Sequence, residues 1–370
     1  MRVPTADLRR QYLGIKSDID SAVFSLIESG SFVDGAPVDQ LEESIAAVCG
    51  TRYGVAVASG TDALTLSLAA SGIGPGDEVI TTPFTFCATT EAIALVGARP
   101  VYADIDSCTF NLDVEQVERL ITPRTKVILP VDLFGHMVNR RALADIARKH
   151  NLTLISDSAQ AIGARQYGRP IGAETDMSTL SFYPSKNLGA YGDGGMVLTS
   201  DPDIAKRLRS LRAHGIGERG AYYHERVGYC SRLDSLQAVV LRAKLPHLAS
   251  WNEGRRRNAA MYHELLSKAT ETSIVLPRCE PGNYHIYHQY TIRSPHRDRL
   301  QAYLREHDVE TKIFYPIPMH LQPAYAYLGY KEGDFPTAER AAREVLSLPI
   351  HPELTADQIH YAADLMRNFR

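Results

Sequence analysis

Ser181-Phe-Tyr-Pro-Ser-Lys186-Asn-Leu-Gly-Ala-Tyr-Gly-Asp-Gly-Gly195 places one lysine among small and apolar residues and ends in a glycine-rich run. Glycine permits left-handed backbone angles and lets the chain approach another group closely. A lysine held by such a loop can be shielded from water, which lowers its pKa and frees its amine to form a Schiff base. On its own, the pattern is more typical of a surface lysine beside a turn. A catalytic role for Lys186 therefore needs support from elsewhere in the chain.

An acid ends an upstream apolar run of β character, Leu152-Thr-Leu-Ile-Ser-Asp157, and an amide follows at Gln160. Ligands of α/β sheets bind beyond the carboxyl ends of the strands. An aspartate there can pair with the protonated ring nitrogen of pyridoxal 5'-phosphate (PLP), which makes the ring an electron sink. Gln160 can hydrogen-bond the ring hydroxyl. Taken alone, Asp157 could equally be a helix N-cap.

A third feature is Val55-Ala-Val-Ala-Ser59-Gly60-Thr61-Asp62, where a strand pattern turns into a helical one. The free N–H groups at a helix N-terminus form an anion site, although an ordinary capped turn has the same residues. In chain order, the three features predict a phosphate cradle at Gly60, Thr61 and Asp62, a ring-nitrogen acid at Asp157, and a Schiff-base lysine at Lys186.

With these features in place, the sequence resembles the DegT/DnrJ/EryC1/StrS family of sugar aminotransferases, which are PLP enzymes of fold type I. The matching motifs span nearly the whole chain: Asp7-Leu-Arg-Arg-Gln-Tyr12, Ser59-Gly-Thr-Asp-Ala-Leu64, Ser181-Phe-Tyr-Pro-Ser-Lys186-Asn-Leu-Gly189, Ser231-Arg-Leu-Asp-Ser-Leu-Gln-Ala238 and Tyr315-Pro-Ile-Pro-Met-His320-Leu-Gln-Pro-Ala-Tyr325. The resemblance implies an α/β fold with a mostly parallel seven-stranded sheet flanked by helices, plus a smaller α+β C-terminal domain. We expect a large domain over 1–245, whose N-terminal helix packs near the small domain over 246–370.

The resemblance also implies roles for single residues. Phe86 would stack on the cofactor ring, and Ser181 would bind the cofactor phosphate. Substrate contacts are implied for Tyr183, Arg232, Tyr315 and His320. The ordinary alternatives are a core phenylalanine, a turn serine, a surface ion pair and a structural tyrosine.

The chain departs from the family pattern at Cys230, where the family usually has an asparagine that reaches the PLP phosphate of the neighbouring subunit. A thiol is a weaker donor than a carboxamide. Cys230 is therefore a cofactor-binding candidate whose contact is in doubt: either Ser231 or a backbone amide replaces it, or phosphate binding is weaker.

The alternation of apolar patterns predicts the elements. Strands are expected at 53–58, 78–82, 99–103, 126–130, 153–156, 177–181 and 196–199, with helices between most of them. One helix is expected over 8–29. The C-terminal part should contain strands at 290–294 and 310–314 and helices at 297–307, 337–345 and 355–369. A polar loop over 214–226 is expected to act as a lid or to cross a dimer interface.

Composition narrows the classes of partner. The 40 Lys+Arg nearly balance the 43 Asp+Glu, for a net charge of −3, which gives no electrostatic case for nucleic acid or an anionic membrane. No stretch is apolar enough to cross a bilayer, and the N-terminus lacks a secretory h-region. The five cysteines have no close-pair spacing, which favours a reducing cytoplasm without a disulfide framework or metal site.

The resemblance implies transfer of an amino group from an amino acid, glutamate being the expected donor, to a UDP- or dTDP-linked keto-sugar. A 3-keto hexose is the favoured acceptor, and a homodimer with shared active sites is implied. Alternatives are a PLP-dependent sugar dehydratase, although relatives of that class carry histidine at the lysine position, and a regulatory protein that retains the PLP fold. A Rossmann-type oxidoreductase is disfavoured because no GxGxxG motif follows an early strand.

Overall fold

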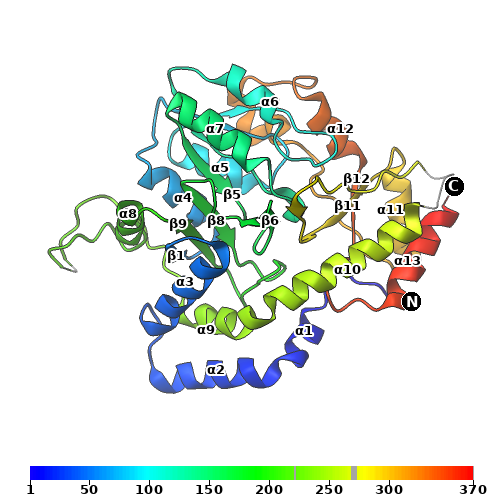
Figure 1. The fold of residues 1–370 in the computed structure, drawn as a ribbon, viewed down its shortest axis with the longest axis horizontal. Helices are drawn as coiled ribbons and strands as arrows, with labels where there is room; N and C mark the ends of the chain where they lie inside the picture. The colour runs from blue at the N-terminus through cyan, green and yellow to red at the C-terminus, as the bar shows by residue number, and fades with distance from the viewer. Residues whose placement is uncertain (221, 268–272, 370) are drawn as a thin grey trace.

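A mixed sheet forms the centre of the molecule in the computed structural model, which describes residues 1–220, 222–267 and 273–369 (Figure 1). Within this described part, the sheet has seven strands in the order β1-β9-β8-β5-β4-β2-β3. Its strands are β1 Tyr53–Val57, β2 Glu78–Thr81, β3 Arg99–Tyr102, β4 Thr125–Ile128, β5 Thr153–Asp157, β8 Met177–Ser181 and β9 Gly195–Thr199. All pairings are parallel except those of β9, which runs antiparallel to β1 and β8. The predicted mostly parallel seven-stranded sheet is therefore confirmed.

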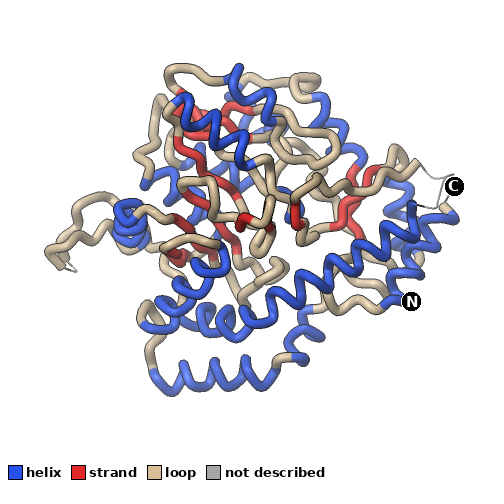
Figure 2. The backbone as a smooth tube through the Cα atoms, in the orientation of Figure 1, coloured by secondary structure: helices blue, strands red, loops and turns tan. Residues whose placement is uncertain are grey.

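Helices cover both faces of this sheet (Figures 1 and 2). One face packs against α4 (Gly60–Ala70), α5 (Cys87–Leu95) and α8 (Pro202–Arg212). The opposite face packs against α3 (Ala36–Cys49), α7 (Arg140–His150) and α9 (Ser235–Lys244). Successive strand residues face opposite sides: Val197 lies in the first core, and its neighbours Met196 and Leu198 lie in the second. Burial on both faces explains why these strands read as continuous apolar runs.

The N-terminal segment contains two helices, so the prediction of one helix over 8–29 was wrong at its centre. The helices are α1 (Leu8–Gly14) and α2 (Lys16–Ser29). Ile15 separates them with a non-helical backbone and packs with Ile19 against Val240 of α9. The buried Ile15 therefore lies at the point where α1 ends and the chain changes direction. Further upstream, Val3 pairs with Val309 of the C-terminal part.

The C-terminal part has its own core, in which an antiparallel pair, β11 (Tyr290–Arg293) and β12 (Val345–Leu348), packs with α10 (Leu248–Ser267) and α13 (Ala356–Asn368). The helices α11 (Arg297–Glu306) and α12 (Pro336–Glu344) agree with their predicted positions. The strand predicted at 310–314 was wrong. The fully buried run of β12 takes the place beside β11, and 310–314 contributes a single bridge from Lys312 to Ser347. The expected domain division at 245/246 stays a prediction.

The remaining elements are short. They are the helix α6 (Val114–Val117), a small sheet of β6 (Arg165–Gln166), β7 (Arg169–Pro170) and β10 (Asn283–Tyr284), and the 3-10 turns η1 (Glu118–Leu120), η2 (Leu133–Gly135), η3 (Leu245–His247), η4 (Met319–Leu321) and η5 (Pro323–Leu328). Over the described ranges, no helix is both long enough and apolar enough to cross a membrane. The loop predicted over 214–226 extends away from the body beside α8 (Figure 1), and its residue 221 lies outside the described residues.

Candidate active site

A cavity of about 640 Å³ lies beyond the carboxyl ends of the parallel strands, between the central sheet and the segment that follows α11. Most of the site residues predicted from the sequence line this one cavity: Gly60, Thr61, Phe86, Asp157, Gln160, Ser181, Tyr183, Lys186 and Tyr315. They lie at or just after the ends of β1, β2, β5 and β8 and in the segment after α11, and these positions are far apart in the chain. The sheet therefore assembles the site, as is typical of α/β folds.

Lys186 lies in the loop between β8 and β9 and is only partly exposed. Burial lowers the pKa of its amine to about 8, against the opposing influence of the negative charge of Asp157. The loop is braced by its own backbone, since Lys186 N donates to Tyr183 O at 2.8 Å and Ala190 N donates to Phe182 O at 2.7 Å. A lysine with a lowered pKa on a fixed loop can present a neutral, nucleophilic amine near neutral pH.

Asp157 ends β5 and is buried. Its Oδ2 accepts a hydrogen bond from Thr89 Oγ1 at 2.8 Å, and its Oδ1 accepts one from Ala159 N at 3.2 Å. Burial raises the pKa of this carboxyl, while these two hydrogen bonds and the charge of Lys186 act in the opposite direction. A buried carboxyl of this kind is stabilised by a cationic group placed opposite it.

The N-terminus of α4 meets the end of β8 and the start of β9 at very short range. Ser59 caps the helix by accepting from Asp62 N at 3.0 Å, which leaves the amides of Gly60 and Thr61 in the open first turn. A Cβ built on Gly60 would lie 2.7 Å from the Cβ of Ser181, and one on Gly195 would lie 2.2 Å from Ser59 O. Glycine at both positions lets helix amides and the Ser181 hydroxyl share one corner of the cavity, which is a ready site for an anion.

Aromatic side chains form another wall. Phe86 is 55% exposed although it is apolar, and its ring lies 6.1 Å from the ring of Tyr315. Gln160 is oriented at both ends, because its Oε1 accepts from Phe134 N at 2.6 Å and its Nε2 donates to the Tyr315 hydroxyl at 3.1 Å. An exposed aromatic face beside a fixed amide suits a flat, polar ring. Phe86 is therefore not a buried core residue, which was the alternative left open by the sequence.

A second cavity of about 620 Å³ adjoins the first through Ser59 and Asp193. Asp62, Cys230 and Arg232 line this second space rather than the first. Arg232 Nη2 lies 3.9 Å from the Cys230 sulfur, and Arg232 Nε lies 3.8 Å from Asp34 Oδ2.

The structure does not bring His320 to either space. Its ring is buried, its Nε2 lies 3.1 Å from Glu339 Oε1, and it packs edge-on against Phe335. The family resemblance implied a substrate contact for His320, but η4, which contains it, and α12 enclose its side chain instead.

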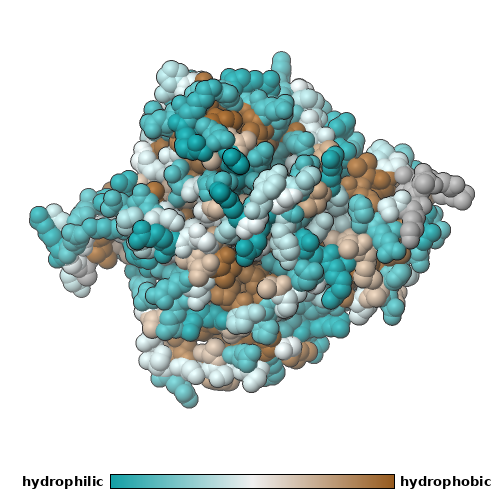
Figure 3. Space-filling model, in the orientation of Figure 1, coloured by the Kyte–Doolittle hydropathy of each residue, from teal (hydrophilic) through white to brown (hydrophobic). Residues whose placement is uncertain are grey.

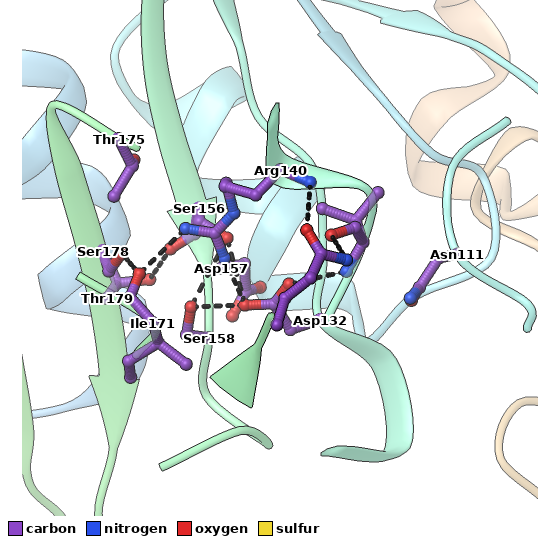
Figure 4. Close-up of polar contacts among 12 residues, drawn as sticks. Asn111, Asp132, Arg140, Ser156, Asp157, Ser158, Ile171, Thr175, Ser178 and Thr179 are labelled. Atoms are coloured by element: carbon purple, nitrogen blue, oxygen red, sulfur yellow. Dashed lines mark hydrogen bonds and ion pairs between the residues drawn. The ribbon is translucent and has the colours of Figure 1, made fainter. Parts of the chain in front are cut away.

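A buried charge pair supports Asp157 from behind (Figure 4). Asp132 and Arg140 are both about 1% exposed or less and are joined at 2.6 Å. The Asp132 carboxylate also accepts hydrogen bonds from Ser158 Oγ at 2.6 Å and Ser156 Oγ at 3.3 Å. Because strand residues alternate, fixing both serines on the Asp132 side directs Asp157 to the other side, toward the cavity.

Two residues of the site that were not predicted from the sequence are Thr89, which donates to Asp157, and His288, which lines the cavity. Thr89 lies three residues after Phe86, and its polar side chain was the signal in the sequence that could have identified it as a site residue. His288 comes just before β11, in a part of the chain that patterns assign to another core. The sequence offers no sign that β11 begins beside the lysine loop.

Comparison with known proteins places this geometry in a family. The model of the DegT/DnrJ/EryC1/StrS aminotransferase family matches residues 14–367. The "Pleiotropic regulatory protein" of Geobacillus stearothermophilus is 48% identical over 369 residues, covering 100% of this chain and 99% of that protein. The UDP-N-acetyl-3-dehydro-alpha-D-glucosamine 3-aminotransferase of Acidithiobacillus ferrooxidans is 43% identical over 365 residues, covering 99% and 97%. The crystal structure of S. venezuelae DesV in complex with a ketimine intermediate matches with a TM-score of 0.96 at 44% identity, covering 99% and 98%. The chain therefore belongs to the DegT/DnrJ/EryC1/StrS aminotransferase family.

Proposed function

We propose that the protein is a PLP-dependent aminotransferase that moves an amino group from an amino acid to a nucleotide-linked keto-sugar. One observation carries the proposal: Lys186, with its lowered pKa, and Asp157, a buried carboxyl, line the same cavity and interact electrostatically. The distance between these two groups must be set by the fold, because Asp157 ends β5 and Lys186 lies in the loop between β8 and β9. Family membership gives the same class of activity.

The residues of the cavity fit PLP group by group. The amides of Gly60 and Thr61 and the hydroxyl of Ser181 would hold the phosphate, at the corner that only glycine leaves open. Asp157 would face the ring nitrogen and supply the negative partner of its proton. Phe86 would lie against the ring, and Gln160 would reach its hydroxyl. When bound, PLP supplies an aldehyde and an electron-withdrawing ring that stabilises negative charge at the α-carbon of an amino acid.

The chain's own residues would then perform the proton transfers. Lys186 Nζ would hold the cofactor covalently at rest and, once released, would remove the α-proton of the amino donor. In the opposite half of the reaction it would return a proton to the carbon that receives the amine. Asp157 would keep the ring nitrogen protonated throughout, because a buried carboxylate gains most from a cation that it contacts. Tyr183 and Tyr315, on the cavity rim and wall, would contact the substrate.

For the substrates, we propose L-glutamate as the donor and a UDP- or dTDP-linked 3-keto hexose as the acceptor. The name of the relative from A. ferrooxidans, a 3-aminotransferase acting on a UDP-linked 3-dehydro sugar, supports this choice. The second cavity adjoins the first and offers room for a nucleotide, and its lining includes the cation Arg232 together with the acids Asp62, Asp193 and Asp234.

We also propose a homodimer that works in the cytoplasm. Several apolar side chains are exposed in the single chain: Val33, which lines the second cavity, is 56% exposed, its neighbour Phe32 is 51% exposed, and Val227 is 94% exposed. Apolar patches also interrupt the mainly hydrophilic face in Figure 3. The five thiols are all free, as suits a reducing compartment. Size-exclusion chromatography with light scattering tests the dimer, and a monomer at micromolar concentration would contradict it.

The direct test of function is a set of nucleotide keto-sugars incubated with the protein, PLP and glutamate, read by mass spectrometry. The proposal predicts an amino sugar and 2-oxoglutarate in equal amounts from at least one UDP- or dTDP-linked 3-keto sugar. Lys186→Ala is the matched control and should give neither product. Loss of water without gain of nitrogen would instead identify a dehydratase.

A regulatory role is the second candidate, because the relative from G. stearothermophilus carries a regulatory name. Glutamate alone separates the two. An aminotransferase should convert stoichiometric glutamate to 2-oxoglutarate in the first half-reaction, whereas a sensor that only binds PLP should leave glutamate unchanged. The presence of Asp157, Gln160 and Ser181 in the cavity with Lys186 favours turnover.

A further inference from the structure

His288 is a buried polar residue on the wall of the cavity, and neither the sequence patterns nor the proposed chemistry gives it a role. It lies just before β11, is 5% exposed, and lines the same cavity as Lys186. Its Nδ1 lies 3.0 Å from Asn187 Oδ1. Across the described part of the chain, no hydrogen bond reaches its other nitrogen, Nε2, which is also not one of the enclosed, unpaired polar atoms. The exposed 5% of the residue therefore includes Nε2.

The orientation of the His288 ring is fixed by two buried asparagines. Asn252 Nδ2 donates to the backbone oxygen of Ile162 at 3.0 Å, so Asn252 Oδ1 is an acceptor. Asn187 Nδ2 donates to that Oδ1 at 2.7 Å and also lies 3.4 Å from Ile286 O. The Nδ2 of each asparagine thus donates to the backbone carbonyl of another residue, and a carbonyl cannot donate in return. Neither side-chain amide can be flipped without losing a buried hydrogen bond.

The direction of these bonds determines the state of the imidazole. Because Asn187 donates through Nδ2, its Oδ1 must accept, and the proton between Asn187 and His288 belongs to Nδ1. Burial, together with the positive charges of Lys186 and Arg255, lowers the pKa of His288 well below its usual value. A neutral ring protonated at Nδ1 has a lone pair at Nε2. The cavity wall beside Lys186 therefore carries a hydrogen-bond acceptor with a fixed position.

We propose that His288 is a binding residue of this site, whose Nε2 accepts a hydrogen bond from a hydroxyl or ammonium group of the molecule held beside Lys186. The proposal rests on the proposed function for the identity of that molecule: the ammonium would come from the amino donor, and the hydroxyl from the sugar. Asn187 and Asn252 are positioning residues, because they act through His288. An acceptor that cannot turn into a donor selects for ligands that donate at this point.

The tautomer can be measured without any ligand or reaction. The protein without cofactor, labelled with 15N in its histidine rings, should show His288 protonated at Nδ1 and unprotonated at Nε2 in long-range 1H–15N NMR spectra from pH 6 to 8. The resonance is assigned by its absence in His288→Gln. Asn187→Leu removes the acceptor for Nδ1 and should move the population toward the other tautomer. A ring protonated at Nε2, or a cationic ring at pH 6.5, would overturn the proposal whatever the enzyme turns over.

Kinetics on the holoenzyme then identify the group that His288 binds. His288→Phe removes the acceptor and should raise the KM of one substrate about tenfold, the usual effect of losing one hydrogen bond. His288→Gln keeps an acceptor near the same point and should recover most of that loss. If the KM rises only for glutamate, His288 binds the ammonium group of the donor. If the KM rises only for the sugar, His288 binds a hydroxyl group of the sugar. Parent values for both substrates in a folded His288→Phe would overturn the proposal, whereas an inactive parent enzyme would refute only the proposed function.

Discussion

Two lysines show, at the scale of single residues, how position rather than pKa decides reactivity. Burial lowers the pKa of both Lys186 and Lys244 to about 8. Lys244 is 1% exposed, donates to Gly189 O at 2.7 Å and lies over the ring of Tyr191, so its amine braces the loop that carries Lys186. Lys186 instead lines the cavity opposite Asp157. The amine that can meet a ligand is the one at 186.

The lowered pKa of Lys186 predicts a pH dependence of cofactor capture. Only the neutral amine attacks an aldehyde, and its share grows as the pH rises toward the pKa. The rate at which the cofactor-free protein takes up PLP should increase about tenfold per pH unit well below pH 8 and become level above it. Stopped-flow absorbance measures this rate. A rate that keeps climbing to pH 10 would contradict the account, because it would mean an ordinary lysine.

At this scale the sequence could predict a shared location only for residue types that have few uses. A glycine-flanked lysine and an acid at a strand end have recognisable chemistry, and the structure puts Lys186 and Asp157 in one cavity. His320 and His288 could not be told apart in this way. Which histidine is enclosed by a helix and which lies on the cavity wall depends on packing between segments far apart in the chain.

At the scale of elements, the end of β5 illustrates how a strand is held for function. Ser156 and Ser158 bind Asp132 on one side, and Asp157 between them faces the other. Arg140, the first residue of α7, balances the charge of Asp132 in a fully buried pair. The apolar run of β5 was predictable from its composition. The pairing of Asp132 with Arg140 was not, because a polar residue after a strand usually signals a turn.

Removing one partner of this pair should lower the free energy of unfolding far more than replacing both partners. Arg140→Met leaves the Asp132 carboxylate buried without a cation, which should lower the free energy of unfolding by about 3–5 kcal/mol. The double variant Asp132→Asn with Arg140→Met removes both charges and should recover most of that loss. Urea unfolding followed by circular dichroism measures both. A double variant as unstable as the single one would show that shape, and not charge, makes this region stable.

A second prediction concerns the close contact between β9 and the start of α4. Gly195→Ala would place a Cβ 2.2 Å from Ser59 O, a backbone atom that can move only with the N-terminus of α4. We expect the affinity for PLP to fall at least about tenfold, because the helix amides leave the phosphate corner. Gly14→Ala is the matched control, since nothing lies within 4 Å of its Cβ. Equal affinity in the two variants, by fluorescence titration, would refute the anion corner.

At the scale of the whole molecule, the cavity joins two hydrophobic cores. Its floor and phosphate corner come from the central sheet, and Ile313, Phe314 and Tyr315 come from the segment beside the C-terminal core. The alternation of strands and helices made the sheet predictable. The outcome at 310–314 was not, because the sequence does not show that the buried strand β12 pairs with β11 while 310–314 contributes only the bridge from Lys312 to Ser347.

A ligand that contacts both parts should stabilise both together. At a PLP concentration 100 times its Kd, the free energy of unfolding should rise by about 2.7 kcal/mol. Hydrogen exchange should slow in 58–62 and also in 313–315, where the wall closes the cavity. Protection limited to the sheet loops, seen by mass spectrometry, would mean that the C-terminal segment takes no part in cofactor binding.

The most direct measurement locates the covalent bond itself. The protein is incubated with PLP, reduced with borohydride, digested and analysed by mass spectrometry. The account predicts one modified peptide, labelled at Lys186, and no label in Lys186→Ala. Lys244 is an internal control, because its pKa is lowered to the same value while its amine is bound to Gly189. A label on Lys244, or one spread over surface lysines, would contradict the assignment of Lys186.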